Sequence, residues 1–285
     1  MRRVPVLAAA CAAAAAVLLL PNGVNAAPAT SHHLEVTTVK PAKSELPAYH
    51  PKATRAAAET CDPPNDHIGP GLLGVSTTPV DIPVGVHDVK SFIYTAHVKD
   101  DCDIESVEIH SYRIDDSVTL DFALFYVLTE SDGTQTWAAK IEIDPVADLA
   151  NPAAGTWHSD VHPTDVNHNS SNTRGAVFYL QRWSQITNNA SPEPVAKGRT
   201  ITVSGKLSRA NWDDYEYHGY ANHPVTLQFR TPTGSYSDVK TIDTSSTGTL
   251  KTTVKAAQDG CFRFYFKGTT TTKPVKGVGD CVDVR

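Results

Sequence analysis

The sequence predicts an all-β protein of two tandem β-sandwiches, and three observations support this fold class. Many segments alternate apolar and polar residues, which is the pattern of a strand with one buried face. After the N-terminal leader, no segment has a convincing helical period apart from a single turn near residues 146–149. The chain also repeats itself at an offset of 111 residues, where Val75 matches Ile186 and Pro83 matches Pro194. Two copies of one pattern indicate two domains with the same topology.

Residues 1–26 are predicted to be a signal peptide. Two arginines follow the initiator Met, and residues 4–20 are apolar and uncharged. Val24 and Ala26 then offer small residues at the −3 and −1 positions of a signal peptidase site. The apolar run is shorter than the ~20 residues of a membrane span, and Pro21 ends it. We therefore expect a secreted, extracellular protein with no membrane span in the mature chain.

The predicted mature chain is acidic. Loss of the two leader arginines lowers the 25 basic side chains to 23, against 31 acidic ones, which leaves a formal charge of −8. An acidic chain without a basic run does not suit nucleic acid or an anionic membrane as a partner. The predicted partner is instead a cell-wall or extracellular glycan, or another protein.

Residues 27–74 are predicted to form an extended or disordered stalk. This stretch is rich in Pro, Ala, Thr and Lys and has no sustained period of 2 or 3.6. GPGLLG at residues 69–74 matches the dinucleotide pattern G-x-G-x-x-G, but no strand pattern precedes it and no helix pattern follows. Nucleotide binding is therefore not predicted.

Residues 75–185 are predicted to form the first sandwich. Its opening segment contains two prolines, which suits an edge strand. Residues 90–99 alternate cleanly, and an acidic turn leads into the next strand. The sequence SDGT at residues 131–134 is a strong hairpin signal. Further strands are predicted at 90–99, 104–114, 118–129, 136–144, 157–162 and 176–181. Together with the opening strand, they number about seven.

Residues 186–285 are predicted to form the second sandwich, which opens with a similar Pro-broken edge strand. A strand at 200–207 follows, and then an insert. After the insert the alternating segments are 225–230, 237–244, 250–255, 261–267 and 275–284. Seven strands in about 100 residues are typical of a small sandwich.

The motifs SGKL, PVTLQF, SDVKTI, TGTLKTTV and CFRFYFKG resemble the bacterial immunoglobulin-like sandwich of secreted actinobacterial proteins. AHVKDDCDIESV in the first domain resembles the A-x-V-x-D-x-S-G-I-x-S-V strand–turn–strand of such domains, with Cys102 and Asp103 where small turn residues are usual. The resemblance covers roughly residues 75–285. It implies two tandem immunoglobulin-like β-sandwiches in a secreted protein. No characterised activity comes with it, although some members carry a calcium-binding label.

Four cysteines remain after the leader, and an exported chain favours disulfides. Four cysteines allow three pairings. Cys261 and Cys281 each lie ten residues from Thr271, the centre of the last turn, and both fall on the outward face of their strands. This register predicts a cross-strand disulfide. Cys102 lies in the turn after the strand at 90–99, and the antiparallel neighbour of that strand, which starts at Val75, begins at the same end of the domain. Cys61 lies only 14 residues before Val75, so Cys61–Cys102 is the second predicted bridge.

The sequence contains no HExxH, G-x-S-x-G, Walker or CxxC motif, so an enzyme is not predicted. The best candidate for a metal site is a strand segment on which His158, Asp160 and His162 share one face. Two imidazoles and a carboxylate suit Zn²⁺ or Cu²⁺, with His168 as a fourth ligand. The alternative is a solvated polar face above a core strand anchored by Trp157.

The turn that contains Asp100, Asp101, Asp103 and Glu105 is a second candidate, because Ca²⁺ prefers carboxylate oxygens. It lacks the spacing and the glycine of an EF-hand loop. Turns are also rich in Asp for conformational reasons alone.

The insert between the strands at 200–207 and 225–230 is the only aromatic and acidic cluster of the mature chain, and it is the predicted ligand-binding site. Its members are Trp212, Asp213, Asp214, Tyr215, Glu216, Tyr217 and Tyr220. Rings beside carboxylates suit a glycan, and three carboxylates suit Ca²⁺. The structural alternative is that the rings pack over the open end of the sandwich.

These patterns together predict a secreted, non-catalytic binding or structural protein of the cell surface or extracellular space. The alternative is an extracellular calcium-binding protein, and no cofactor other than Ca²⁺ is expected. A secreted hydrolase would need a carboxylate pair or an activated nucleophile in a cleft, and no spacing in the sequence indicates one.

Overall fold

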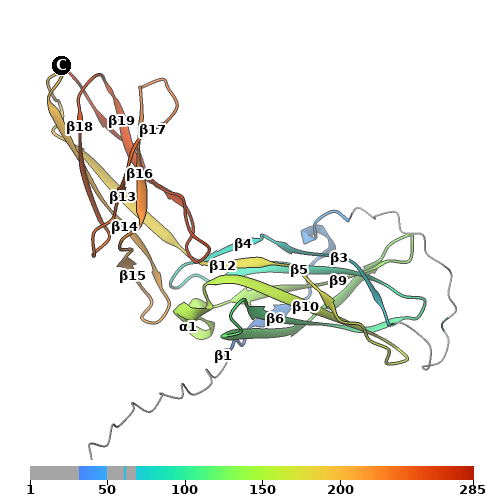
Figure 1. Cartoon of the computed structure of the whole chain (residues 1–285). Helices are drawn as coiled ribbons and strands as arrows, with labels where there is room; N and C mark the ends of the chain where they lie inside the picture. Colours follow the sequence, from blue (N-terminus) through green and yellow to red (C-terminus); the bar gives the residue numbers. More distant parts are fainter. Residues whose placement is uncertain (1–31, 50–60, 62–68) are drawn as a thin grey trace, which may run out of the picture. The chain divides into compact units, whose positions relative to one another are not determined.

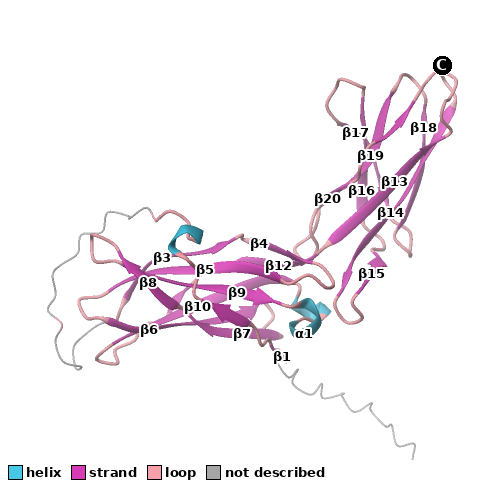
Figure 2. Ribbon diagram, turned by 180° about the vertical axis from the view of Figure 1, so that it is seen from behind, coloured by secondary structure: helices cyan, strands magenta, loops and turns pink. Residues whose placement is uncertain are grey.

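The computed structural model describes residues 32–49, 61 and 69–285. The predicted signal peptide lies outside these residues. Regular structure in the described part is almost all β-strand (Figures 1 and 2). The helical segments there are single turns: η1 (Lys43–Glu45), α1 (Pro145–Asp148) and η2 (Asn151–Ala153). The all-β prediction is confirmed, and α1 coincides with the predicted turn near residues 146–149.

The first sandwich consists of two facing sheets. One sheet contains β1 (His32–His33), β7 (Val118–Ala123), β6 (Ile104–Arg113), β10 (Gly155–Asp165), β12 (Phe178–Arg182) and β4 (Asp81–Val84), with β11 (Thr173–Arg174) beside β10. The other contains β2 (Thr37–Val39), β9 (Gln135–Ile143), β5 (Lys90–Lys99) and β3 (Gly71–Thr78), with β8 (Phe125–Thr129) beside β9. Inward side chains such as Trp157, Phe92 and Phe178 fill the space between the sheets.

The second sandwich has the same plan with fewer strands. One sheet contains β13 (Ser184–Ser191), β14 (Thr200–Asn211), β18 (Thr249–Lys255) and the short β15 (Glu216–Gly219). The other contains β17 (Ser237–Asp243), β16 (Pro224–Arg230), β19 (Gly260–Phe266), β20 (Val275–Lys276) and β21 (Asp280–Val282). Phe262, Phe264 and Phe266 of β19 face the core, as their alternation predicts.

The two sandwiches pair equivalent strands in the same order. β3, β5 and β9 are neighbours in the first, and β13, β14 and β18 in the second. In each, the chain crosses to the opposite sheet directly after the first of these strands, β3 or β13, and there runs parallel to the last segment of that sandwich. β4 does so beside β12, and Val195 does so in a bridge to Val284. The protein is therefore built of two tandem immunoglobulin-like β-sandwiches.

The predicted stalk is wrong for the described residues between 32 and 49. β1 pairs with β7 and β2 pairs with β9, so both segments extend the sheets of the first sandwich. Leu34 between them is only 7% exposed and belongs to the core. Strands of two and three residues are too short to show an alternating pattern, which is why the sequence did not indicate them. Gly71–Gly74 of the GPGLLG segment lie in β3, paired with β5.

A buried hydrogen-bond network connects the two sheets of the first sandwich. The hydroxyl of Tyr94 lies 2.7 Å from Oγ of Ser159 and accepts from the backbone N–H of Ala176 at 3.1 Å. Oγ of Ser159 in turn donates to the carbonyl of Ala176 at 2.8 Å. Burial raises the pKa of Tyr94, so this hydroxyl stays protonated and able to donate.

Replacement of Tyr94 with Phe is expected to lower the free energy of unfolding by about 1–3 kcal/mol, because the buried N–H of Ala176 then loses its acceptor. Denaturant unfolding measures this loss. The control is Tyr126→Phe, whose hydroxyl contacts Thr129 at the surface and whose loss should change stability by less than about 0.5 kcal/mol. Equal effects of the two replacements would show that the network contributes nothing specific.

Candidate functional site

The predicted ligand-binding insert forms the tip of a hairpin between β14 and β15. β14 continues to Asn211, beyond the predicted end at residue 207, and pairs with β15 through Asn211↔Glu216. Tyr215 has a φ of 60° at the turn. Asp214 accepts from the backbone N–H of Glu216 at 3.2 Å and lies 2.8 Å from Nε2 of His218. The turn is therefore an ordered structure with its own side-chain contacts.

Trp212 does not lie at the surface. Its side chain is 0% exposed and belongs to the core cluster of the first sandwich, together with Ala210. The indole N–H donates to the carbonyl of Gly85, at 2.9 Å. A ring with no exposed surface cannot stack on a sugar, so the prediction of Trp212 as a ligand-binding residue is wrong. The hairpin of the second sandwich instead inserts this ring into the first.

Asn151 of η2 fastens the same hairpin through its backbone and its side chain. The backbone N–H of Asn151 donates to Oδ1 of Asp213 at 2.9 Å, and Oδ1 of Asn151 accepts from the N–H of Trp212 at 3.0 Å. Its amide nitrogen also contacts Asp213 and Asn211. Tyr215 donates from its hydroxyl to the carbonyl of Val146 at 3.1 Å. Three residues of the predicted binding set therefore connect the two sandwiches.

The remaining aromatic residues of the set are also engaged in packing. Tyr217 packs against the core of the first sandwich, and Tyr220 belongs to the core of the second. The guanidinium of Arg209 lies 4.0 Å from the centre of the Tyr220 ring. Asp213, Asp214 and Glu216 are the exposed members of the set, and the first two already have partners. The packing interpretation holds for the rings, although most of them pack on the neighbouring sandwich rather than on their own.

A buried arginine supports the base of the hairpin. Nε of Arg182 donates to the carbonyl of Ala210 at 2.5 Å, and the backbone N–H of Ala210 donates to the carbonyl of Trp183. Burial, together with the positive charge of Arg209, lowers the pKa of Arg182 to about 10. The side chain therefore stays charged at neutral pH while it binds the hairpin backbone.

His158, Asp160 and His162 all lie on the outward face of β10, where they alternate with buried residues, as predicted. Neighbours on one face of a strand are about 6.6 Å apart along it, and the three groups do not converge on one point. His168 lies in a different turn, where its Nδ1 is 3.2 Å from Oε2 of Glu105. The structure does not assemble this set of four, and metal binding by it stays a prediction.

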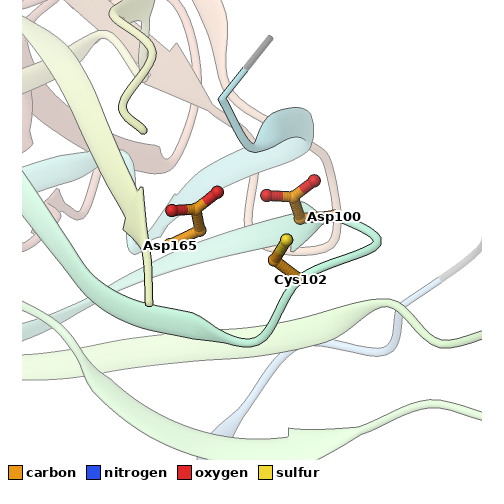
Figure 3. A group of neighbouring side chains, drawn as sticks. All are labelled: Asp100, Cys102 and Asp165. Carbon is orange, nitrogen blue, oxygen red and sulfur yellow. The ribbon is translucent and has the colours of Figure 1, made fainter. Parts of the chain in front are cut away.

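The predicted calcium-binding turn does not form a cluster of its own, and only Asp100 of this turn joins a group of potential metal ligands. Within the described residues, one group of three potential metal ligands has its atoms within 4.8 Å of one another, and it consists of Asp100, Cys102 and Asp165 (Figure 3). Asp101, Asp103 and Glu105 of the predicted calcium site are exposed and stay outside it. Asp165 comes from the end of β10 and accepts N–H groups of Asn167 and Asn169, which orders the turn that follows.

Both predicted cysteine pairs are at disulfide distance. Cys61 and Cys102 have Cα atoms 4.9 Å apart. The sulfur of Cys102, which lies beside Asp100 and Asp165, therefore belongs to a disulfide. Cys261 and Cys281 are direct partners in the pairing of β19 with β21, with Cα atoms 3.8 Å apart. The symmetric register about Thr271 is thus confirmed.

No family model and no curated protein matches this chain. Solved structures similar to it include dimeric latent PorU from Porphyromonas gingivalis, at 14% identity over 76% of this chain and 20% of that chain, with a TM-score of 0.28. The D00–D0 domain of intimin matches at 14% identity over 73% and 98%, with a TM-score of 0.26. A marsupial T cell receptor matches at 11% identity over 75% and 73%, with a TM-score of 0.36.

With TM-scores below 0.5, these similarities do not indicate a function for this protein. The chain also spans only a fifth of the PorU chain. The sheets and the joint define the class of protein: a tandem immunoglobulin-like β-sandwich protein whose sandwiches are connected by an inserted hairpin. The actinobacterial family suggested by the sequence motifs stays a prediction. The helical turns in the described part of the chain do not have the length and apolar character of a membrane span.

Proposed function

We propose that this protein is an extracellular, non-catalytic module with a structural role, in which two immunoglobulin-like sandwiches act as one stiff unit at the cell surface. The observation that carries the proposal is the buried insertion of Trp212 into the first sandwich. A flexible pair of domains would expose this ring, whereas a stiff pair buries it. The absence of catalytic motifs from the sequence supports a non-catalytic role.

The extracellular location is supported by the two cysteine pairs. Both are at bonding distance, and disulfides persist mainly in oxidising compartments. The proposed partner is a cell-wall or extracellular glycan, or a second protein. The aromatic rings of the hairpin are engaged in packing, so this partner would have to contact another surface.

Calcium binding is the alternative function, and one observation favours it: the carboxylates of Asp100 and Asp165 lie together. Ca²⁺ takes six to eight oxygen ligands, so two carboxylates alone are a weak basis for a site. An increase in the melting temperature with added Ca²⁺, abolished in Asp100→Asn, would favour this alternative.

Fractionation of the producing cells tests the proposed location. We expect the protein outside the cytoplasmic membrane, with both cysteine pairs oxidised, because thiols stay reduced in most cytosols. Immunoblotting of the fractions and peptide mass mapping without reduction measure both properties. A cytosolic protein with four free thiols would contradict the proposal.

A further inference from the structure

The outward face of the sheet that contains β6, β7 and β10 is rich in imidazole and carboxylate groups. Glu108 and His110 project from β6, and Asp160 and His162 project from β10. β6 and β10 are antiparallel neighbours, and their register places His162 directly opposite Glu108 and Asp160 directly opposite His110. The sequence alone could not show this, because 50 or more residues separate the positions on the two strands.

These four positions are the corners of a small rectangle. Directly opposite residues have Cβ atoms ~4.5–5.5 Å apart, and neighbours along one face are ~6.6 Å apart. Each histidine therefore has one carboxylate opposite it and the other carboxylate next to it on its own strand. Glu108, His110 and His162 also line a hollow of ≈ 650 Å³ on this face, together with Asp121 of β7.

His110 already has the carboxylate partner that is typical of a metal-binding histidine. Its Nδ1 donates to Oδ1 of Asp121 at 2.5 Å, which leaves Nε2 as the nitrogen with a free lone pair. A carboxylate bound to the second ring nitrogen is the usual support of a histidine that binds a metal. Among the described residues, Glu108, Asp160 and His162 make no hydrogen bond or ion pair that would compete for their ligand atoms.

We propose that Glu108, His110 and His162 bind a divalent transition metal of the Zn²⁺ class in this hollow, with Asp121 as the positioning residue of His110. Two imidazole nitrogens and one carboxylate oxygen leave a fourth tetrahedral position for water, an arrangement that suits Zn²⁺ and also accepts Cu²⁺. Ca²⁺ does not suit it, since Ca²⁺ prefers oxygen ligands alone.

Binding requires rotation of the side chains of Glu108 and His162. The ligand atoms of these residues do not converge within 4.8 Å of one another in the structure. His110 keeps its bond to Asp121, and the half-buried side chain of His162 has room to rotate toward the hollow. The paired cysteines cannot compete for the metal while they are oxidised.

The site differs from the one predicted along β10 by itself, and a matched control separates the two. His158 projects from the same strand and the same face as His162, but it lies opposite Tyr112 in the register and does not line the hollow. His158→Ala should therefore leave the metal affinity unchanged. His110→Ala and His162→Ala should each weaken it by more than about tenfold, and Asp121→Asn by about tenfold.

Titration of the metal-free, untagged protein with Zn²⁺ against a chromophoric chelator measures these affinities. We expect one Zn²⁺ per chain, no competition by Ca²⁺, and unchanged melting temperatures of the metal-free variants. With Cu²⁺ as the probe, electron paramagnetic resonance should show coupling to two nitrogens in the parent protein and to one in His162→Ala. Absence of Zn²⁺ binding, or a loss of affinity in His158→Ala equal to that in His110→Ala, would overturn the proposal.

Discussion

Replacement of Trp212 with Ala is expected to lower the free energy of unfolding by roughly 3–5 kcal/mol, the largest effect of any single substitution considered for this chain. The indole is fully buried among residues of the first sandwich, although it belongs to a strand hairpin of the second. Its removal creates a cavity at the joint and leaves the carbonyl of Gly85 without its donor. The substitution should also convert a single cooperative melting transition into two, because the sandwiches then unfold independently.

Differential scanning calorimetry of the parent and variant measures both effects. Tyr215→Phe is the control, since it removes only the hydrogen bond to Val146 and should cost about 1 kcal/mol or less. If Trp212→Ala cannot be purified, Trp212→Phe keeps an apolar ring without the N–H and should show a smaller shift in the same direction. Two separate transitions in the parent protein would mean that the joint does not couple the sandwiches.

Removal of the Cys61–Cys102 disulfide is expected to cost about 4 kcal/mol in the double variant Cys61→Ala/Cys102→Ala. The bridge closes a loop with a sequence separation of 41, and the chain-entropy model assigns that value to a loop of this length. The physical reason lies mainly in the unfolded chain, which regains the freedom that the bridge removes.

The matched comparison is Cys261→Ala/Cys281→Ala, whose bridge spans 20 residues and should contribute about 3 kcal/mol. Chemical denaturation under non-reducing conditions gives both values, and peptide mapping verifies the pairing beforehand. A free Cys61 in the purified protein, or identical unfolding midpoints with and without reductant, would contradict this prediction.

The strands could be predicted from the sequence because their signal is local. In β10 every second residue is buried, and the alternation is readable from Trp157, Ser159 and Val161 alone. The pairing of Cys261 with Cys281 was also local, since one turn connects their strands. By contrast, β1 and β2 show no pattern, because two or three residues at a sheet edge are held by partners far along the chain.

The candidate sites depended on contacts that the sequence does not specify. A cluster of rings at residues 212–220 indicates that aromatic surface must be covered, but it does not say whether a ligand or a neighbouring sandwich covers it. In the structure the neighbouring sandwich covers it, and Gly85, Val146 and Asn151 of that sandwich bind the hairpin. The polar face of β10 is a similar case, because the pairing of β10 with β6 places Glu108 and His110 beside it. The sequence does not specify this register.

The sequence by itself therefore determined the all-β class through alternation and the repeated sandwich plan through the repeat at 111 residues. It also determined both cysteine pairs, Cys261–Cys281 through spacing about one turn and Cys61–Cys102 through the end of the domain at which the strands start. Only the tertiary structure decided the burial of Trp212 and the arrangement of imidazoles and carboxylates beside β10. Burial at a joint and register between distant strands are set by the packing of whole sheets, and no local pattern of residues encodes either of them.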